Sequence, residues 1–131
     1  MTQVAKMSPK KILVVEDNET LGRFLLHLLQ LKGYAAELAP DGEVGMERYL
    51  HNRPDLVLTD VYMPNSEGIG LITQIRACDQ TTPIIVMSGG DPKQDHRYLH
   101  AATALGANAS LNKPFTADDL LNIIRHLLGE Q

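Results

Sequence analysis

The feature that most constrains the fold of this chain is a regular alternation of short apolar runs with longer amphipathic segments. Five runs rich in aliphatic and β-branched residues are predicted to be strands: 11–15, 34–38, 55–60, 83–87 and 109–112. The segments that follow them carry apolar residues at helical spacing. Five strand–helix units in a row predict an α/β fold, in which a parallel sheet has helices on both faces and right-handed crossovers.

Several of the predicted helices begin and end at residues that favour helix termini. Asn18 and Asp41 are good N-cap residues, and Thr116 followed three positions later by Asp119 matches a capping box. Gly33 stands where the first helix must stop, and glycine readily ends a helix. These signals support the division into strand–helix units.

Length and charge exclude several classes of protein. The 131 residues fit one domain, which we expect to span residues 11–131 after a frayed or disordered segment, 1–10. Twelve lysines and arginines against sixteen aspartates and glutamates give a net charge of −4, which argues against a protein that binds nucleic acid through phosphate contacts. The single cysteine, Cys78, excludes an intramolecular disulfide and a cysteine-based zinc cluster.

Hydropathy points to a protein that does not enter a membrane. The apolar stretches are short and interrupted, so none is long enough to span a bilayer. Residues 1–11 lack the apolar core of a secretory signal. The sequence therefore predicts a cytoplasmic protein.

Polar side chains follow four of the five predicted strands. Glu16 and Asp17 come after the first strand, Asp60 ends the third, Ser88 follows the fourth, and Lys113 follows the fifth. In open parallel sheets, ligands bind beyond the carboxyl ends of the strands. We therefore expect three carboxylates, a hydroxyl and an ammonium group to converge in one shallow pocket.

This set of side chains is typical of phosphoryl chemistry. Three neighbouring carboxylates repel one another, and a hard divalent cation such as Mg²⁺ relieves that repulsion. An aspartate beside Mg²⁺ can itself accept a phosphoryl group, while Lys113 and Ser88 neutralise and orient the phosphoryl oxygens. Each residue alone has an ordinary structural explanation, such as a helix N-terminus or a turn. Their joint occurrence at successive strand ends favours the functional interpretation.

Five segments carry a resemblance to a known family, and together they extend over nearly the whole chain. They are ILVVEDN at 12–18, DLVLTDVYMP at 55–64, PIIVMSG at 83–89, LGA at 105–107 and NKPF at 112–115. With them the sequence resembles a receiver domain of two-component response regulators. The resemblance implies a flavodoxin-like fold with five parallel strands in the order 2-1-3-4-5.

The resemblance also implies a metal site. Asp17 matches the carboxylate that binds Mg²⁺ directly, and Glu16 matches the outer acidic residue that acts through water. Asp60 is shared between the metal and the phosphoryl group, and Tyr62 matches the residue whose backbone carbonyl binds the metal.

Three further positions match the residues that handle the phosphoryl group. Asp60 matches the phosphorylated aspartate, and Ser88 matches the hydroxyl residue that closes onto the phosphoryl group. Lys113 matches the active-site lysine, and its bond to Pro114 resembles the cis peptide of the family.

By this resemblance, the chain is a phosphoacceptor and not an enzyme. A sensor histidine kinase or a histidine phosphotransfer protein would supply the phosphoryl group, with Mg²⁺ as the cofactor. Phosphorylation would switch a protein-binding surface formed by the fourth helix, the fifth strand and the fifth helix. Because no segment follows Gln131, we expect a stand-alone regulator that docks to an output protein and binds neither nucleic acid nor membrane.

Two alternatives remain open at this point. The chain could be a pseudo-receiver that binds partners without phosphorylation, although the complete acidic set and Lys113 argue against it. A phosphatase that forms an aspartyl phosphate would need a second aspartate two residues after Asp60, where this chain has Tyr62.

Two departures from the family pattern concern signalling. Ser110 stands where the family usually has an aromatic residue, so an inward-turning ring is not available there. The interval from Ser88 to Lys113 is longer than expected, and the additional residues fall in the segment 89–96. We expect that segment to influence the choice of partner.

Overall fold

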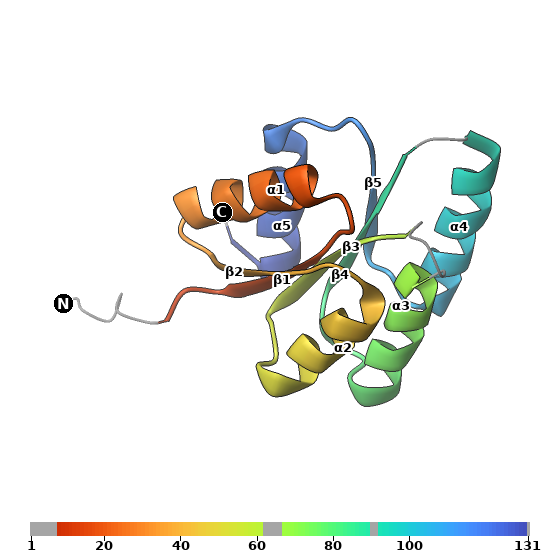
Figure 1. Cartoon of the computed structure of the whole chain (residues 1–131), viewed down its shortest axis with the longest axis horizontal. Helices are drawn as coiled ribbons and strands as arrows, with labels where there is room; N and C mark the ends of the chain where they lie inside the picture. The colour runs from red at the N-terminus through yellow and green to blue at the C-terminus, as the bar shows by residue number, and fades with distance from the viewer. Residues whose placement is uncertain (1–7, 62–66, 90–91, 131) are drawn as a thin grey trace.

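The structure is a computed structural model that describes residues 8–61, 67–89 and 92–130. Strands and helices alternate along the whole described chain (Figure 1). The strands are β1 (Lys11–Val15), β2 (Ala35–Ala39), β3 (Leu56–Asp60), β4 (Ile84–Ser88) and β5 (Ala109–Asn112). The helices are α1 (Glu19–Leu31), α2 (Gly42–His51), α3 (Glu67–Cys78), α4 (Pro92–Leu105) and α5 (Ala117–Leu128).

The five strands form one parallel sheet in the order β2-β1-β3-β4-β5, as predicted. The central strand register places Val14 of β1 between Leu38 of β2 and Leu58 of β3. Leu58 in turn pairs with Ile85 of β4. This order places β1 and β3 side by side in the middle of the sheet, so the residues that follow them lie close together.

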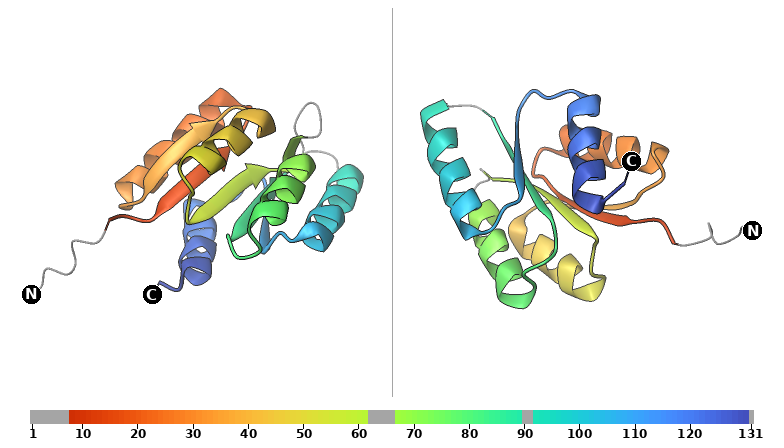
Figure 2. Two further views of the ribbon diagram at one scale, coloured as in Figure 1. Left: turned by 90° about the horizontal axis from the view of Figure 1, so that it is seen from below. Right: turned by 180° about the vertical axis from the view of Figure 1, so that it is seen from behind.

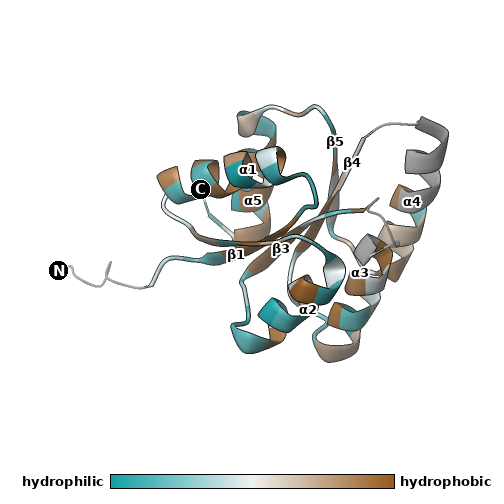
Figure 3. Cartoon of the chain, in the orientation of Figure 1, coloured by the Kyte–Doolittle hydropathy of each residue, from teal (hydrophilic) through white to brown (hydrophobic). Residues whose placement is uncertain are grey.

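Helices cover both faces of the sheet (Figure 2). Helices α1 and α5 pack on one face, and α2, α3 and α4 pack on the other. Successive side chains of a strand point to opposite faces of the sheet. Ile12 and Val14 therefore pack in the core under α1 and α5, while Leu13 and Val15 pack in the core under α2, α3 and α4. The inner strands β1, β3 and β4 are buried between these helices on both faces, and this explains why their sequences are mostly apolar (Figure 3).

The predicted helix caps are confirmed. Asn18 and Asp41 each accept a hydrogen bond from a backbone N–H in the first turn of the helix that follows. Thr116 and Asp119 form the reciprocal capping box. Gly33 adopts a left-handed backbone, with φ of +94°, two residues after Leu31, where α1 ends.

Several predicted boundaries are wrong by one residue. Strand β2 begins at Ala35 and not at Tyr34, and it ends at the buried Ala39, whose carbonyl accepts a hydrogen bond from the backbone of Glu16. Strand β4 begins after Pro83, which has no N–H to donate to the sheet. Cys78 is the last residue of α3 and is exposed, whereas the sequence placed it after the helix.

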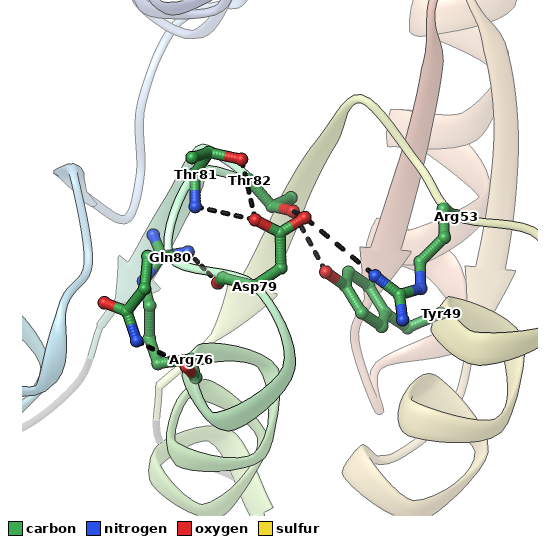
Figure 4. Close-up of polar contacts among 7 residues, drawn as sticks. All are labelled: Tyr49, Arg53, Arg76, Asp79, Gln80, Thr81 and Thr82. Atoms are coloured by element: carbon green, nitrogen blue, oxygen red, sulfur yellow. Dashed lines mark hydrogen bonds and ion pairs between the residues drawn. The ribbon is translucent and has the colours of Figure 1, made fainter.

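A polar cluster joins α2, α3 and β4 at the amino ends of the strands (Figure 4). Asp79 Oδ1 accepts hydrogen bonds of 2.7 and 2.6 Å from the backbone N–H and hydroxyl of Thr81, and Oδ2 accepts one of 3.0 Å from Thr82. Because the single hydroxyl proton of Thr82 goes to Asp79, the buried Tyr49 hydroxyl donates to Thr82 Oγ1 at 3.0 Å. The Arg53 guanidinium lies 4.8 Å from the centre of the Tyr49 ring.

Among the described residues, none of the helices has the length and apolar character needed to cross a lipid bilayer. The predicted frayed segment, 1–10, falls mostly outside the described residues; only residues 8–10 are described, and they are exposed.

Candidate functional site

Polar residues gather at the carboxyl ends of the four strands for which they were predicted. Glu16 and Asp17 follow β1, Asp60 and Ser88 end β3 and β4, and Lys113 follows β5. Glu16 and Asp60 are buried, with 2% and 5% of their surface exposed, whereas Asp17 is exposed. The site therefore has a buried floor and one acidic side chain open to solvent.

Lys113 connects two strands of the site. Its Nζ lies 2.7 Å from Asp60 Oδ2 and 3.0 Å from Glu16 Oε1. The methylene groups of Lys113 pass directly over Gly89, where an added Cβ would lie only 2.8 Å from Lys113 Cβ. Glycine at position 89 thus leaves the space through which the lysine reaches the two carboxylates.

Burial dominates the electrostatics of Glu16. Loss of hydration raises the pKa of Glu16 from 4.5 to about 7, and repulsion by Asp60 acts in the same direction. Hydrogen bonds from the backbone N–H of Asn18 and from Lys113 lower the pKa, but they offset only part of the burial effect. The negative charge on this buried carboxylate is therefore costly in the protein alone.

For the pKa of Lys113, hydrogen bonds and neighbouring charges outweigh burial. Burial lowers the pKa of Lys113, but the hydrogen bonds and charges of Asp60 and Glu16 outweigh that effect and raise it above its ordinary value of 10.5. Lys113 is consequently a permanent cation at neutral pH. It provides fixed positive charge beside Asp60.

The three carboxylates fit a divalent cation. Glu16, Asp17 and Asp60 each offer an oxygen, and these oxygens lie within 4.8 Å of one another. With all three ionised, the single ammonium of Lys113 leaves the group with excess negative charge. Hard oxygen ligands with excess negative charge are what Mg²⁺ prefers. Tyr62, the fourth predicted metal ligand, lies outside the described residues.

Ser88 has a partner that the sequence analysis missed. Its buried hydroxyl donates a hydrogen bond of 2.9 Å to Asn112 Oδ1, across the β4–β5 pair. Asn112 precedes Lys113, but nothing in the sequence indicates that it faces Ser88 until the strand register is known. The peptide bond between Lys113 and Pro114 is cis, as the resemblance implied.

An apolar groove adjoins the site. It has a volume of about 430 Å³ and lies between α1 and the residues that follow β4 and β5. Its lining consists of Leu21, Phe24, Gly89, Lys113, Pro114 and Phe115. Two of these residues, Gly89 and Lys113, also belong to the site, so the groove is continuous with it. Phe24 is 56% exposed, which is high for an aromatic side chain.

The structure describes one of the two departures from the family pattern fully and the other in part. Ser110 lies on β5 and is exposed, so no aromatic ring occupies that position of the strand. Helix α4 begins at Pro92, within the longer segment 89–96, whose residues 90–91 lie outside the described part of the chain. The proposed influence of that segment on partner choice stays a prediction.

A sequence comparison decides the family. The response regulator receiver domain matches residues 12–125 of this chain. The chain belongs to this family. Receiver domains are phosphorylated on an aspartate by histidine kinases and bind Mg²⁺ at an acidic pocket, and in this receiver Glu16, Asp17 and Asp60 form an acidic cluster that could hold a metal.

Individual relatives agree with the assignment. The transcriptional regulatory protein RprY of Bacteroides fragilis is 39% identical over 118 residues, which are 90% of this chain and 49% of RprY. A CheY-like receiver domain protein of Methanospirillum hungatei has a TM-score of 0.84 and 25% identity, covering 93% of this chain and 95% of that structure. A receiver domain from Clostridium thermocellum has a TM-score of 0.82 and 29% identity, covering 92% and 94%.

This receiver spans about half the length of the curated relatives that it matches. The structural neighbours, in contrast, are covered almost completely. The expectation of a stand-alone regulator therefore stays a prediction.

Proposed function

We propose that this receiver accepts a phosphoryl group on Asp60 from the phosphohistidine of a sensor histidine kinase or a histidine phosphotransfer protein. The observation that carries the proposal is the position of Lys113, whose Nζ joins Asp60 and Glu16 at 2.7 and 3.0 Å. Family membership supports the reaction type, and the arrangement of these residues supports the choice of Asp60.

The transfer would proceed at one oxygen of Asp60. That oxygen attacks the phosphorus, a new P–O bond forms, and the P–N bond to the donor imidazole breaks. The imidazole nitrogen keeps the electron pair of the broken bond, and the donor histidine leaves in its unphosphorylated form. Lys113 holds Asp60 in place and supplies positive charge next to the incoming phosphoryl oxygens.

Glu16, Asp17 and Asp60 are the side chains that would hold Mg²⁺. When bound, the metal would neutralise charge on the phosphoryl oxygens and on the three carboxylates. Asp17 is the exposed member of the set, so it stands where a cation and its waters would enter. On Asp60 the phosphoryl group would carry about two negative charges where the free carboxylate carries one, beside Ser88 and the start of the β4–α4 connection, and this change would bias the α4–β5–α5 surface.

The apolar groove is the surface that we assign to the phosphoryl donor. Asp60 is only 5% exposed, so a histidine that reaches it must bring its own protein against the rim of the site. The groove shares Lys113 and Gly89 with the site, and Phe24 supplies exposed apolar area there. An apolar helix that presents the phosphohistidine would fit this chemistry.

Acetyl phosphate with Mg²⁺, followed by intact-mass measurement, tests the acceptor. We expect one phosphate adduct on the wild-type chain and none on Asp60→Asn, because an amide cannot act as the attacking carboxylate. Asp41→Asn is the matched control, since asparagine caps α2 as well as aspartate does. Absence of an adduct on the wild type would favour the phosphorylation-independent pseudo-receiver instead.

Phe24→Asp tests the donor surface. We expect transfer from a histidine kinase that phosphorylates the wild type to fall about tenfold or more, because an aspartate in the groove must be desolvated by the donor. Phosphorylation by acetyl phosphate should stay unchanged, because that small donor does not need the groove. Leu31→Asp, at the far end of α1 and 69% exposed, should leave both reactions unchanged. Equal loss in Phe24→Asp and Leu31→Asp would contradict the assignment.

A further inference from the structure

Asn112 lies at the end of β5, directly opposite Ser88 in the register of the β4–β5 pair. Its Oδ1 accepts a hydrogen bond of 2.9 Å from the Oγ of Ser88, which is completely buried. The carbonyl of Ser88 in turn accepts a hydrogen bond from the backbone N–H of Lys113. Ser88 is thus held, through both its hydroxyl and its carbonyl, by two successive residues of the β5 end.

The hydroxyl of Ser88 can serve one acceptor at a time, because it carries a single proton. Strand β4 is the neighbour of β3, and Asp60 pairs with Met87, the residue before Ser88. A phosphoryl group on Asp60 would therefore present strong oxygen acceptors close to Ser88. Ser88 must release Asn112 before it can donate its proton to such a group.

We propose that Asn112 is a positioning residue that holds the hydroxyl of Ser88 away from the phosphoryl group and so opposes the phosphorylated state. The inference rests on the proposed function, because it assigns Asp60 as the acceptor. It goes beyond that function by naming the acceptor that competes with the phosphoryl group for the proton of Ser88.

The size of the effect follows from the two hydrogen bonds that are exchanged. A bond to a charged phosphoryl oxygen is stronger than the neutral bond to the Asn112 amide, so the exchange goes forward when the phosphoryl group is present. Affinity for that group is nevertheless reduced by the neutral bond that is lost, which corresponds to a factor of about two to ten. Removing the acceptor at position 112 should therefore raise the affinity for the phosphoryl group by the same factor.

The test uses the full chain with Mg²⁺ and beryllofluoride, a non-covalent analogue of the phosphoryl group, and measures the dissociation constant by calorimetric titration. Asn112→Leu removes the acceptor while keeping a similar side-chain volume, so that an apolar group would lie where the exposed Asn112 side chain now meets the buried hydroxyl of Ser88. We expect beryllofluoride to bind Asn112→Leu about two- to tenfold more tightly than the wild type. Asn122→Leu, an exposed asparagine on α5, is the matched control and should bind as the wild type does.

A double-mutant cycle separates this role from a general change in the strand. In a Ser88→Ala chain the competition no longer exists, so adding Asn112→Leu should leave the dissociation constant unchanged. An equal gain with and without Ser88, or no gain in the single variant, would overturn the inference while leaving Asp60 as the acceptor. A wild-type chain that neither binds beryllofluoride nor forms the Asp60 adduct would overturn the proposed function, and this inference with it.

Discussion

At the scale of single residues, the site depends on the reach of one lysine. Lys113 is 97 positions from Glu16 and 53 positions from Asp60 along the chain, yet its ammonium contacts both carboxylates. The flexible stem of a lysine has no fixed direction of its own, so its path is set by what it packs against. In this receiver it packs against Gly89.

Gly89→Val tests that packing. Valine would place a Cβ 2.8 Å from Lys113 Cβ, so the lysine stem has to move away from the backbone. We expect the rate of phosphorylation by acetyl phosphate to fall about tenfold or more, because small displacements of charged groups in a site are costly. Gly70→Val is the control, since an added Cβ at Gly70 meets nothing within 4 Å. Equal rates in the wild type and Gly89→Val would show that Lys113 tolerates the displacement.

At the scale of elements, helix caps follow from local sequence, whereas the exact ends of strands do not. The caps at Asn18, Asp41 and Thr116 could be predicted because each acts on a backbone N–H only a few residues away. The boundaries of β2 could not be predicted to the residue. They depend on the pairing of Ala39 with the chain near Glu16, and a local pattern does not contain that contact.

Asp79 makes the turn between α3 and β4 sensitive to acid. Hydrogen bonds from Thr81, and then from Thr82, lower the pKa of Asp79 from 3.8 to about 2. Because the pKa in the folded chain is below the unfolded value, the ionised carboxylate stabilises the fold above about pH 4. That contribution is lost as the pH falls from about 4 to 2.

Asp79→Asn should therefore be less stable than the wild type at pH 5, and the difference should shrink as the pH approaches 2. Urea unfolding at a series of pH values measures the free energies of both proteins. A difference that stays constant over this range would mean that the carboxylate charge of Asp79 does not contribute.

At the scale of the whole molecule, β1 and β3 bring like charges together. Their adjacency in the middle of the sheet places the oxygens of Glu16, Asp17 and Asp60 within 4.8 Å of one another. Such repulsion destabilises a fold unless a cation balances it. The stability of the whole receiver should consequently depend on Mg²⁺.

Mg²⁺ at ten times its dissociation constant should stabilise the fold by about 1.4 kcal/mol, which raises the Tm by roughly 5 °C in a chain of this size. Asp17→Asn should lose most of this shift, and without Mg²⁺ it should be at least as stable as the wild type, because one repulsive charge is gone. Asp118→Asn, an exposed acid in the first turn of α5, should keep the Mg²⁺ shift. Thermal unfolding with choline chloride at equal ionic strength gives the baseline, and an equal shift in Asp17→Asn would exclude Asp17 as a metal ligand.

The sequence by itself determined the alternation of elements, most of the helix caps, and the polar residues at the strand ends. These features are local, since each depends on residues a few positions apart and on the periodicity of helices and strands. The position of Asp60 at the end of an apolar run could be predicted from the sequence for the same reason.

The sequence predicted that these residues converge, but only the tertiary structure decided the individual contacts that they make. The register of β4 and β5 sets Ser88 opposite Asn112, and the packing of Lys113 on Gly89 directs its ammonium to Glu16 and Asp60. The burial that raises the pKa of Glu16 to about 7 also comes from the assembled layers. Contacts across strands depend on the alignment of distant segments, which no pattern within one segment can specify.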